Sequence, residues 1–398
     1  MLLGKKKRFY SAQIILPVSV YLLTLGYAEI LSWLGNCHGW WEVCWSRYDS
    51  GLYLEISELG HTLKNCGIEN GYVIGSEKWC GNAGWAPFYP FLIYLFHHLS
   101  TLSPAVCGIL LSHTFFIAFL VMMAKIINVH SFKLSNWLTL LLCALCPGGI
   151  HFFSIFPISL LIFLVSIVFW SFYFEKYYYS LLPAYLIALS YSSAIIIFFS
   201  FGVYMIYLFF SSWKQKRMSD FLVEIQKQWY CKNSYKNVLL YLLIPGIIGL
   251  ISLYLYDWFV TGHWNAMYLV QNKYGHLLYS PFKHLEIHYK LLISHQNSSE
   301  IWIDIHNIFF FFTLPILVYF LAKNKNRITP LLILYTLIMW YIPFSIGINV
   351  SLYRSIALLA PVLAFIDPLK NLQKLLILIA FGIFYYFLGI LFVLSILH

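Results

Sequence analysis

Repeated apolar runs of about 20 residues constrain this chain more than any other feature. Each run is long enough to cross a hydrocarbon core of roughly 30 Å as an α-helix. Of the 398 residues, 61% are hydrophobic and only 10% are charged, which is far less charge than a water-soluble domain carries. The sequence therefore predicts an all-α polytopic membrane protein that forms one domain from residue 1 to residue 398.

The apolar runs divide into eleven expected crossings, which are 9–34, 104–127, 134–153, 157–174, 181–191, 193–210, 238–259, 301–321, 328–346, 354–366 and 375–397. The net charge of +10 comes from Lys and Arg in short loops, which indicates topology rather than a nucleic-acid partner. The basic N-terminus is then cytoplasmic, and the first run is a retained anchor rather than a cleaved signal. Loops 35–86 and 260–300 are expected on the opposite side of the membrane.

The eight cysteines fall into two groups. Cys37, Cys44, Cys66 and Cys80 share the first external loop, where two disulfides are expected, and three pairings are possible. A C-x-x-C pair at 143 and 146 is typical of a metal or redox motif. Because it lies inside an apolar run, we expect these two cysteines to be small packing residues.

A short polar stretch follows the first crossing. Between residues 49 and 60, Leu52, Ile56 and Leu59 recur at helical spacing, and Gly60 is a helix stop, so a helix lying on the membrane surface is expected. Asp49 then has two interpretations. It can cap this helix, or its carboxylate can take a proton from a hydroxyl at the membrane surface.

Four segments of the chain carry a resemblance. They are Arg47-Tyr48-Asp49-Ser50-Gly51-Leu52-Tyr53, Trp85-Ala86-Pro87-Phe88-Tyr89-Pro90, Thr261-Gly262-His263-Trp264-Asn265-Ala266-Met267 continuing to Gln271 and Tyr274, and Ser351-Leu352-Tyr353-Arg354 continuing to Pro361. In this order they resemble the signatures of the PIG-V family, whose members are GT-C-type membrane mannosyltransferases of GPI-anchor assembly. Tyr48 stands where the family has Trp, and the acidic residue of a later family stretch is replaced at Phe156-Pro157-Ile158-Ser159.

The resemblance implies a GT-C-like bundle with interfacial helices in the first external loop. It also implies a glycosyltransferase that moves a hexose, mannose in the first instance, from a polyprenyl- or dolichyl-phosphate carrier to a lipid-linked or surface-glycan acceptor. The transfer inverts the sugar on the non-cytoplasmic face. Such a reaction needs a base for the acceptor hydroxyl and positive charge for the departing phosphate.

These requirements lead to a set of candidate residues. Asp49 is the expected catalytic base, and Arg354 is the first choice for the donor phosphate, ahead of Arg47 and Lys273. Arg354 has an alternative role as an interfacial anchor. The expected substrate-binding residues are Tyr48, Ser50, Tyr53, Tyr89, Trp264, Gln271 and Tyr274, although an interfacial aromatic belt also explains the aromatic ones.

No metal or other cofactor is expected, because a lipid-phosphate leaving group carries less charge than a nucleotide diphosphate. The histidines of the second external loop, which are His263, His276, His284, His288 and His295, are interpreted as surface residues because their spacing lacks a compact metal-ligand pattern.

Two other functions fit the same composition. One is a transporter or flippase for lipid-linked sugars, which would place polar residues at mid-membrane. The other is a non-catalytic membrane subunit derived from such an enzyme. We expect a bacterial inner membrane with the site facing the periplasm, or the endoplasmic reticulum membrane if the chain is eukaryotic. Membrane lipids, a sugar-phosphate lipid donor and a glycan or glycolipid acceptor are the expected partners, and no nucleic acid is.

Overall fold

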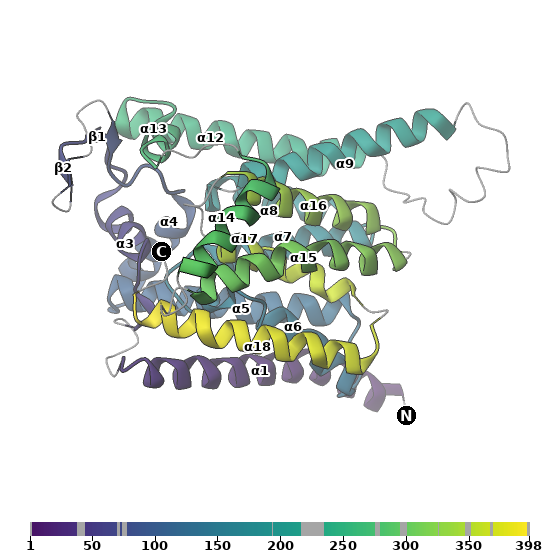
Figure 1. Cartoon of the computed structure of the whole chain (residues 1–398). Helices are drawn as coiled ribbons and strands as arrows, with labels where there is room; N and C mark the ends of the chain where they lie inside the picture. Colours follow the sequence, from purple (N-terminus) through teal and green to yellow (C-terminus); the bar gives the residue numbers. More distant parts are fainter. Residues whose placement is uncertain are drawn as a thin grey trace.

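The computed structural model describes residues 2–37, 44–69, 72–73, 78–192, 194–215, 235–274, 279–294, 301–324, 326–346, 352–366 and 369–395. Long helices run roughly parallel across the molecule (Figure 1). Helices α3, α4 and α13 and the short strands gather at one end of this bundle, whereas the N-terminus lies at the other end. The C-terminus lies toward the end that carries α3 (Figure 1).

Six helices in the described part of the chain are long and apolar enough to cross a membrane. They are α1 (Leu2–Leu34), α5 (Pro104–Ile126), α9 (Ala194–Gln215), the continuous rod of α11 (Tyr235–Val238), η3 (Leu239–Leu243) and α12 (Ile244–Thr261), α15 (Ile301–Lys323), and α18 (Asn371–Val393). Each coincides with an expected crossing. The chain is therefore a multi-pass membrane protein, as the apolar runs predict.

The other five expected crossings fall on shorter helices. These are α6 (Leu134–Ala144), α7 (Ile158–Tyr173), α8 (Leu181–Ser190), α16 (Thr329–Ser345), and α17 (Leu352–Ala357) with the 3₁₀ helix η4 (Ala360–Phe365). Two further 3₁₀ turns, η1 (Gly149–Phe152) and η2 (Tyr177–Ser180), precede α7 and α8. The number eleven thus stays a prediction, because these helices are too short to be identified as spans by length alone.

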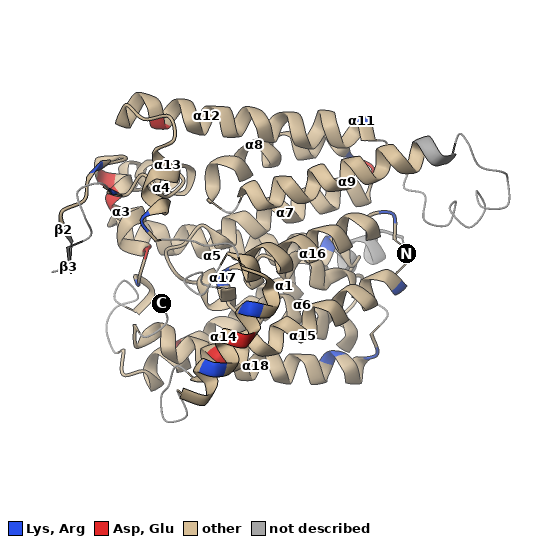
Figure 2. Ribbon diagram, turned by 45° about the horizontal axis from the view of Figure 1, so that its top comes forward, with Lys and Arg blue, Asp and Glu red and all other residues tan. Residues whose placement is uncertain are grey.

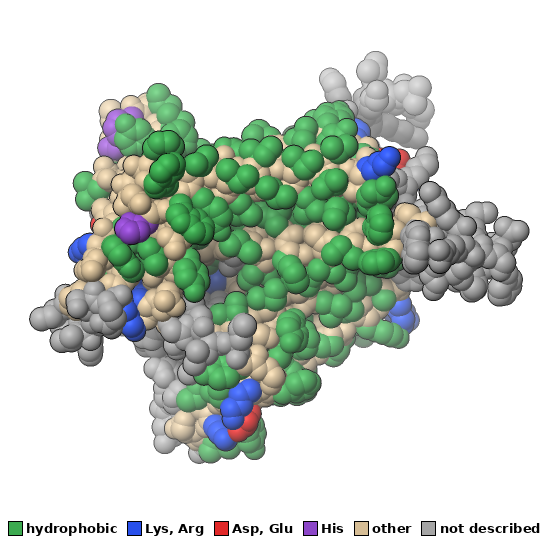
Figure 3. Space-filling model, turned by 90° about the horizontal axis from the view of Figure 1, so that it is seen from above, with side chains coloured by type: hydrophobic (Ala, Val, Ile, Leu, Met, Phe, Trp, Pro, Cys, Tyr) green, Lys and Arg blue, Asp and Glu red, His purple; other side chains and the backbone are tan. Residues whose placement is uncertain are grey.

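The interior is packed by aromatic side chains, and the outer surface of the bundle is also apolar. Phe116, Phe119, Phe152 and Phe153 are fully buried, and their rings lie 5.0–6.4 Å apart, centroid to centroid. Figure 3 shows hydrophobic side chains covering the helices on the outside. Lys, Arg, Asp and Glu gather toward the two ends of the bundle (Figure 2). A lipid bilayer, which is apolar in the middle and polar at both surfaces, favours this distribution of side chains.

The loop expected to be the first external one, residues 35–86, folds over one end of the bundle. It contains α3 (Ser50–Leu59), two antiparallel strand pairs and, at its exit, α4 (Phe88–Leu99). Strand β1 (Lys64–Asn65) pairs with β4 (Trp79–Cys80), and β2 (Ile68–Glu69) pairs with β3 (Tyr72–Val73). At 12 residues, α4 is too short to cross a membrane.

Two disulfides decide among the three possible pairings. Cys37 is bonded to Cys44, and Cys66 is bonded to Cys80. The first joins the end of α1 to the segment before Asp49, and the second joins the ends of β1 and β4. Cys143 and Cys146 are buried free thiols, as expected of packing residues.

The second external loop carries two helices, α13 (Ala266–Asn272) and α14 (Pro281–Ser294). Helix α14 packs against α15 and α16. His276 and His295 lie outside the described residues, so their expected surface positions stay predictions. For His284 and His288 the expectation is wrong, because only 1% and 5% of their surfaces are exposed.

Candidate functional site

Asp49 stands at the first turn of α3 but does not cap it. Its backbone carbonyl accepts hydrogen bonds from the amides of Leu52 and Tyr53 at 3.0 and 3.1 Å, so the residue begins the helix. Its side chain makes no capping hydrogen bond. Tyr48, directly before it, has a positive φ of 53°, a conformation that costs free energy outside glycine. The backbone thus turns sharply here, and the carboxylate is free for another partner.

That partner is Arg354. Its Nη1 donates a hydrogen bond of 2.5 Å to Asp49 Oδ2, across 305 residues of sequence. The two side chains are 12% and 26% exposed, so a ligand can reach a pair that is largely shielded from water. The guanidinium lies 4.8 Å from the centroid of the Phe156 ring, which adds a cation–π contact. The structure therefore joins the first and the last of the four sequence segments.

Several polar groups around this pair have unused hydrogen-bonding capacity. Within the described residues, Ser50 Oγ, Tyr53 Oη and Arg354 Nε are buried and have no hydrogen-bond partner. Burial, with smaller contributions from Tyr191 and Asp49, raises the pKa of the Tyr53 phenol well above its usual value, so its proton stays on the oxygen. Buried polar groups normally have partners. A polar ligand that binds here would supply them.

Helix α3 packs a partly polar face against the rest of the protein. Ser50, Tyr53, Ile56 and Ser57 are the buried residues, whereas Leu59 is 73% exposed. The polar residues Ser50 and Tyr53 thus face the protein, toward the Asp49–Arg354 pair. The spacing of apolar residues does not predict this buried face.

Tyr53 and Tyr89 lie close together, but their hydroxyls differ. The two rings are 5.8 Å apart and edge to face. Tyr89 donates to the carbonyl of Gly108 at 2.8 Å and lies 2.7 Å from the hydroxyl of Ser112. The Tyr89 hydroxyl is therefore committed to α5, whereas that of Tyr53 is available to a ligand.

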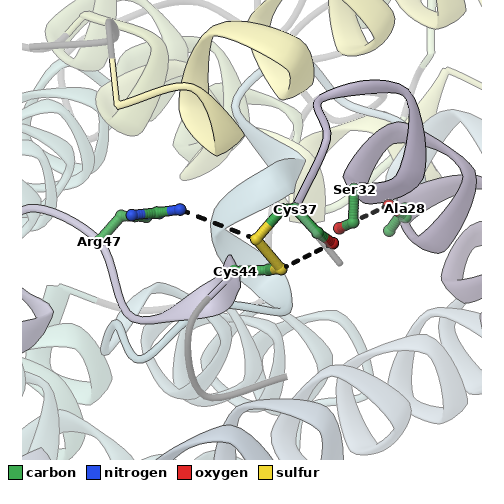
Figure 4. Close-up of a disulfide and its surroundings, with 5 residues drawn as sticks. All are labelled: Ala28, Ser32, Cys37, Cys44 and Arg47. Carbon is green, nitrogen blue, oxygen red and sulfur yellow. Dashed lines mark hydrogen bonds between the residues drawn. A yellow bond between two sulfur atoms is a disulfide. The ribbon is translucent and has the colours of Figure 1, made fainter. Parts of the chain in front are cut away.

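Arg47 points toward a disulfide. Its Nη2 lies 3.7 Å from Cys37 Sγ, and Figure 4 shows the side chain directed at the Cys37–Cys44 bond. The Tyr48 hydroxyl donates to the carbonyl of Leu391 at 3.4 Å, and its ring lies 5.5 Å from that of Phe392. These contacts attach the segment before Asp49 to α18.

The predicted residues of the second external loop lie around α13. Gln271 Nε2 donates to the carbonyl of Gly84 at 2.9 Å, and Lys273 Nζ lies 3.9 Å from Cys80 Sγ. Trp264 is 62% exposed, and Tyr274 is 40% exposed. The contacts of Gln271 and Lys273 thus lead to the first external loop rather than to the ion pair. These two contacts support that loop, and the expected roles of Gln271 and Lys273 in binding stay predictions.

Sequence reasoning missed three residues of the site. Tyr191 lies beside Arg354 and Asp49, and the ring of Tyr353 stacks on that of His151, with centroids 5.4 Å apart. His151 is fully buried, and neither of its ring nitrogens has a partner among the described residues. A Tyr or His inside an apolar run gives no local signal of a site, because only the fold brings the runs together.

Two grooves open on the surface of the bundle. One of about 550 Å³ lies between α3, α4, α8 and α12, with Ile56, Ser57, Leu189 and Tyr256 in its wall. The other, of about 410 Å³, is apolar and lies between α15 and α18. Neither groove is lined by Asp49 or Arg354. The first begins one helical turn beyond Tyr53, so α3 connects it to the ion pair.

Among the described residues, no group of three or more His, Cys, Asp or Glu side chains is placed to hold a metal ion. No family model, curated protein or solved structure matches the chain. The geometry of the site therefore carries the functional argument.

Proposed function

We propose that the protein is an integral-membrane glycosyltransferase of GT-C type, related to the PIG-V mannosyltransferases. It moves a hexose, mannose in the first instance, from a polyprenyl-phosphate carrier to a lipid-linked or surface-glycan acceptor. The observation that carries the proposal is the contact between Asp49 and Arg354. It brings a carboxylate and a guanidinium from distant segments of the chain to one partly exposed place.

The chemistry uses both partners. The Asp49 carboxylate takes the proton of the acceptor hydroxyl, and the hydroxyl oxygen attacks the anomeric carbon of the sugar from the face opposite the phosphate. The bond between that carbon and the phosphate oxygen breaks, and the lipid phosphate leaves with one additional negative charge. Arg354 stabilises this developing charge. Because the hydroxyl attacks from the face opposite the phosphate, the sugar inverts, and the bound donor sugar must come between Asp49 and Arg354, which touch in the ligand-free protein.

The unpartnered groups fit a phosphorylated sugar. Arg354 Nε can donate to a phosphate oxygen, and Ser50 Oγ and Tyr53 Oη can donate to phosphate or sugar oxygens. In the ligand-free protein Arg354 is paired with Asp49. A bound phosphate competes for the guanidinium, and this competition releases the carboxylate to act as a base.

The test compares Asp49 with a second acid from the same helical segment. Full-length protein in membranes is given radiolabelled polyprenyl-phosphate mannose, and label in lipid and glycan fractions is measured for wild type, Asp49→Asn and Glu55→Gln. Asp49→Asn should lower transfer by about 10²- to 10⁴-fold, as loss of a general base does. Glu55→Gln should stay within about twofold, because its carboxylate has no role in the proposed site.

Rates are normalised to the folded fraction, measured by size-exclusion chromatography, because Asp49→Asn also removes an ion pair. Wild-type transfer by a folded Asp49→Asn protein would exclude Asp49 as the base. If the wild-type protein transfers none of a panel of lipid-phosphate hexoses, the proposed transferase activity is rejected. A non-catalytic membrane subunit would then be the better explanation.

A further inference from the structure

A buried polar network joins α14 to α15 and shares no residue with the Asp49–Arg354 pair. His284 and His288 come from α14, and Asp304, His306 and Asn307 come from the first turns of α15. All five side chains belong to residues that are at most 5% exposed. Such a group is costly to bury unless its members satisfy one another.

The hydrogen bonds converge on one atom, His288 Nε2. It lies 2.7 Å from His284 Nε2 and 3.1 Å from the side-chain amide of Asn307. The other ring nitrogen, Nδ1, lies 2.7 Å from Asp304 Oδ1. When His288 is neutral with its proton on Nδ1, facing Asp304 Oδ1, its Nε2 presents a single lone pair. Two neighbouring groups thus compete to donate to one acceptor.

A cation at the same point resolves the competition. With its proton on Nδ1, His284 directs a second lone pair from Nε2 toward His288 Nε2. Rotating the Asn307 amide by half a turn directs its oxygen to the same point. Its NH₂ group then donates to His306 Nδ1, the atom that already lies 3.0 Å from this amide. Three donor atoms then face one centre.

We propose that His284 Nε2, His288 Nε2 and the amide oxygen of Asn307 bind a divalent cation of the zinc class. His284 and His288 are spaced i, i+4 on one helix, which places both rings on the same face. Asp304 acts on the second nitrogen of His288, and a carboxylate in this position typically orients a metal-binding histidine and raises its basicity. The third ligand is an amide rather than a third imidazole or a carboxylate.

The geometry requires a small adjustment. Zinc–nitrogen bonds of about 2.0–2.1 Å place two tetrahedral ligands roughly 3.4 Å apart, so the two Nε2 atoms must separate by ~0.7 Å on binding. The ion would lie between two packed helices and would hold α14 of the second external loop on α15, with a water in the fourth position that three protein ligands leave open. The inference does not depend on the proposed transferase activity.

The experiment measures metal in the purified full-length protein. The protein carries an affinity tag without histidine, is stripped with a chelator, and is then loaded with Zn²⁺ and desalted before elemental mass spectrometry. Wild type should retain about one equivalent of zinc. His284→Ala and His288→Ala should lose it, whereas His61→Ala, which removes a buried histidine that pairs with Asp257 instead, should retain it.

The Asp304→Asn variant distinguishes a metal site from a buried cluster that is held by hydrogen bonds alone. It keeps all three proposed ligands, so zinc binding should persist but weaken by about 10- to 100-fold, the usual effect of losing such an orienting carboxylate. Zinc should also raise the melting temperature of wild type and leave that of His288→Ala unchanged. Wild type that retains no zinc, or His284→Ala and His288→Ala variants that retain as much as wild type, would overturn the proposal.

Discussion

Gly148 lies directly against the backbone of Tyr353. A Cβ atom added at Gly148 would stand 2.0 Å from the carbonyl oxygen of Tyr353, and the φ of this glycine is +81°. Both facts exclude a larger side chain. Because Tyr353 directly precedes Arg354, this contact sets the position of the arginine relative to Asp49.

Gly148→Ala should therefore damage both stability and the site. Overpacking costs about 1–3 kcal/mol, and a left-handed conformation adds about 1–2 kcal/mol outside glycine. We expect a melting temperature in detergent that is lower by several degrees and a loss of transfer activity beyond the loss of folded protein.

Gly202→Ala is the matched control, because nothing lies within 4 Å of a Cβ added there. That change should be neutral or stabilising by up to about 1 kcal/mol, since alanine favours a helix. Equal effects of the two substitutions would show that Gly148 does not position Tyr353.

The ion pair between Asp49 and Arg354 should be measurable as a coupling in stability. Each of Asp49→Asn and Arg354→Gln leaves one charge without its partner in a largely shielded place, so each should destabilise the fold. The double variant should lose less free energy of unfolding than the two single variants lose together, by about 1–2 kcal/mol, as is usual for residues in contact. Thermal unfolding of all four proteins provides the cycle. Additivity within about 0.3 kcal/mol would mean that the pair contributes nothing.

The membrane class and six of the crossings could be predicted because apolar length is a local property of the sequence. The short helices could not be assigned in the same way. Helix α17 and η4 together occupy a run expected to cross, yet neither is long enough by itself. Their place depends on what surrounds them, such as the Tyr335 hydroxyl that donates to the carbonyl of Leu358 at 2.9 Å.

The site was predictable only where its residues lie in a polar stretch. Asp49, Ser50 and Tyr53 lie close together in sequence, and Arg354 stands out as a lone charge in an apolar run. Tyr191 and His151 have no such signal, because their proximity to Arg354 arises from packing between runs. The roles expected of the second-loop residues stay predictions. Their polar side chains support a neighbouring loop rather than the ion pair.

The two disulfides should be detectable by thiol counting. Denatured protein should gain four alkylated thiols on reduction, and peptide mapping should show the pairs Cys37–Cys44 and Cys66–Cys80. Removing the second bond with paired serines should cost about 3 kcal/mol, because it closes a loop of 14 residues. Fewer than four new thiols, or crosslinked peptides of another pairing, would contradict the structure.

Gln271 distinguishes loop support from substrate binding. Its Nε2 holds the carbonyl of Gly84, and a Cβ at Gly84 would lie 3.1 Å from that nitrogen, so the two segments are in close contact. Gln271→Met keeps the bulk and removes the donor. We expect a loss of about 1 kcal/mol in stability, seen as a lower melting temperature, with an unchanged KM for the donor lipid.

The neighbouring Asn272→Ala is the control, because Asn272 is exposed and its loss should change neither quantity. A substrate contact would behave differently. It would raise KM in Gln271→Met while leaving the melting temperature of the ligand-free protein intact, since a group that only binds substrate does not stabilise the empty fold. That outcome would return Gln271 to the substrate-binding set and would require α13 to approach Asp49 when the donor binds.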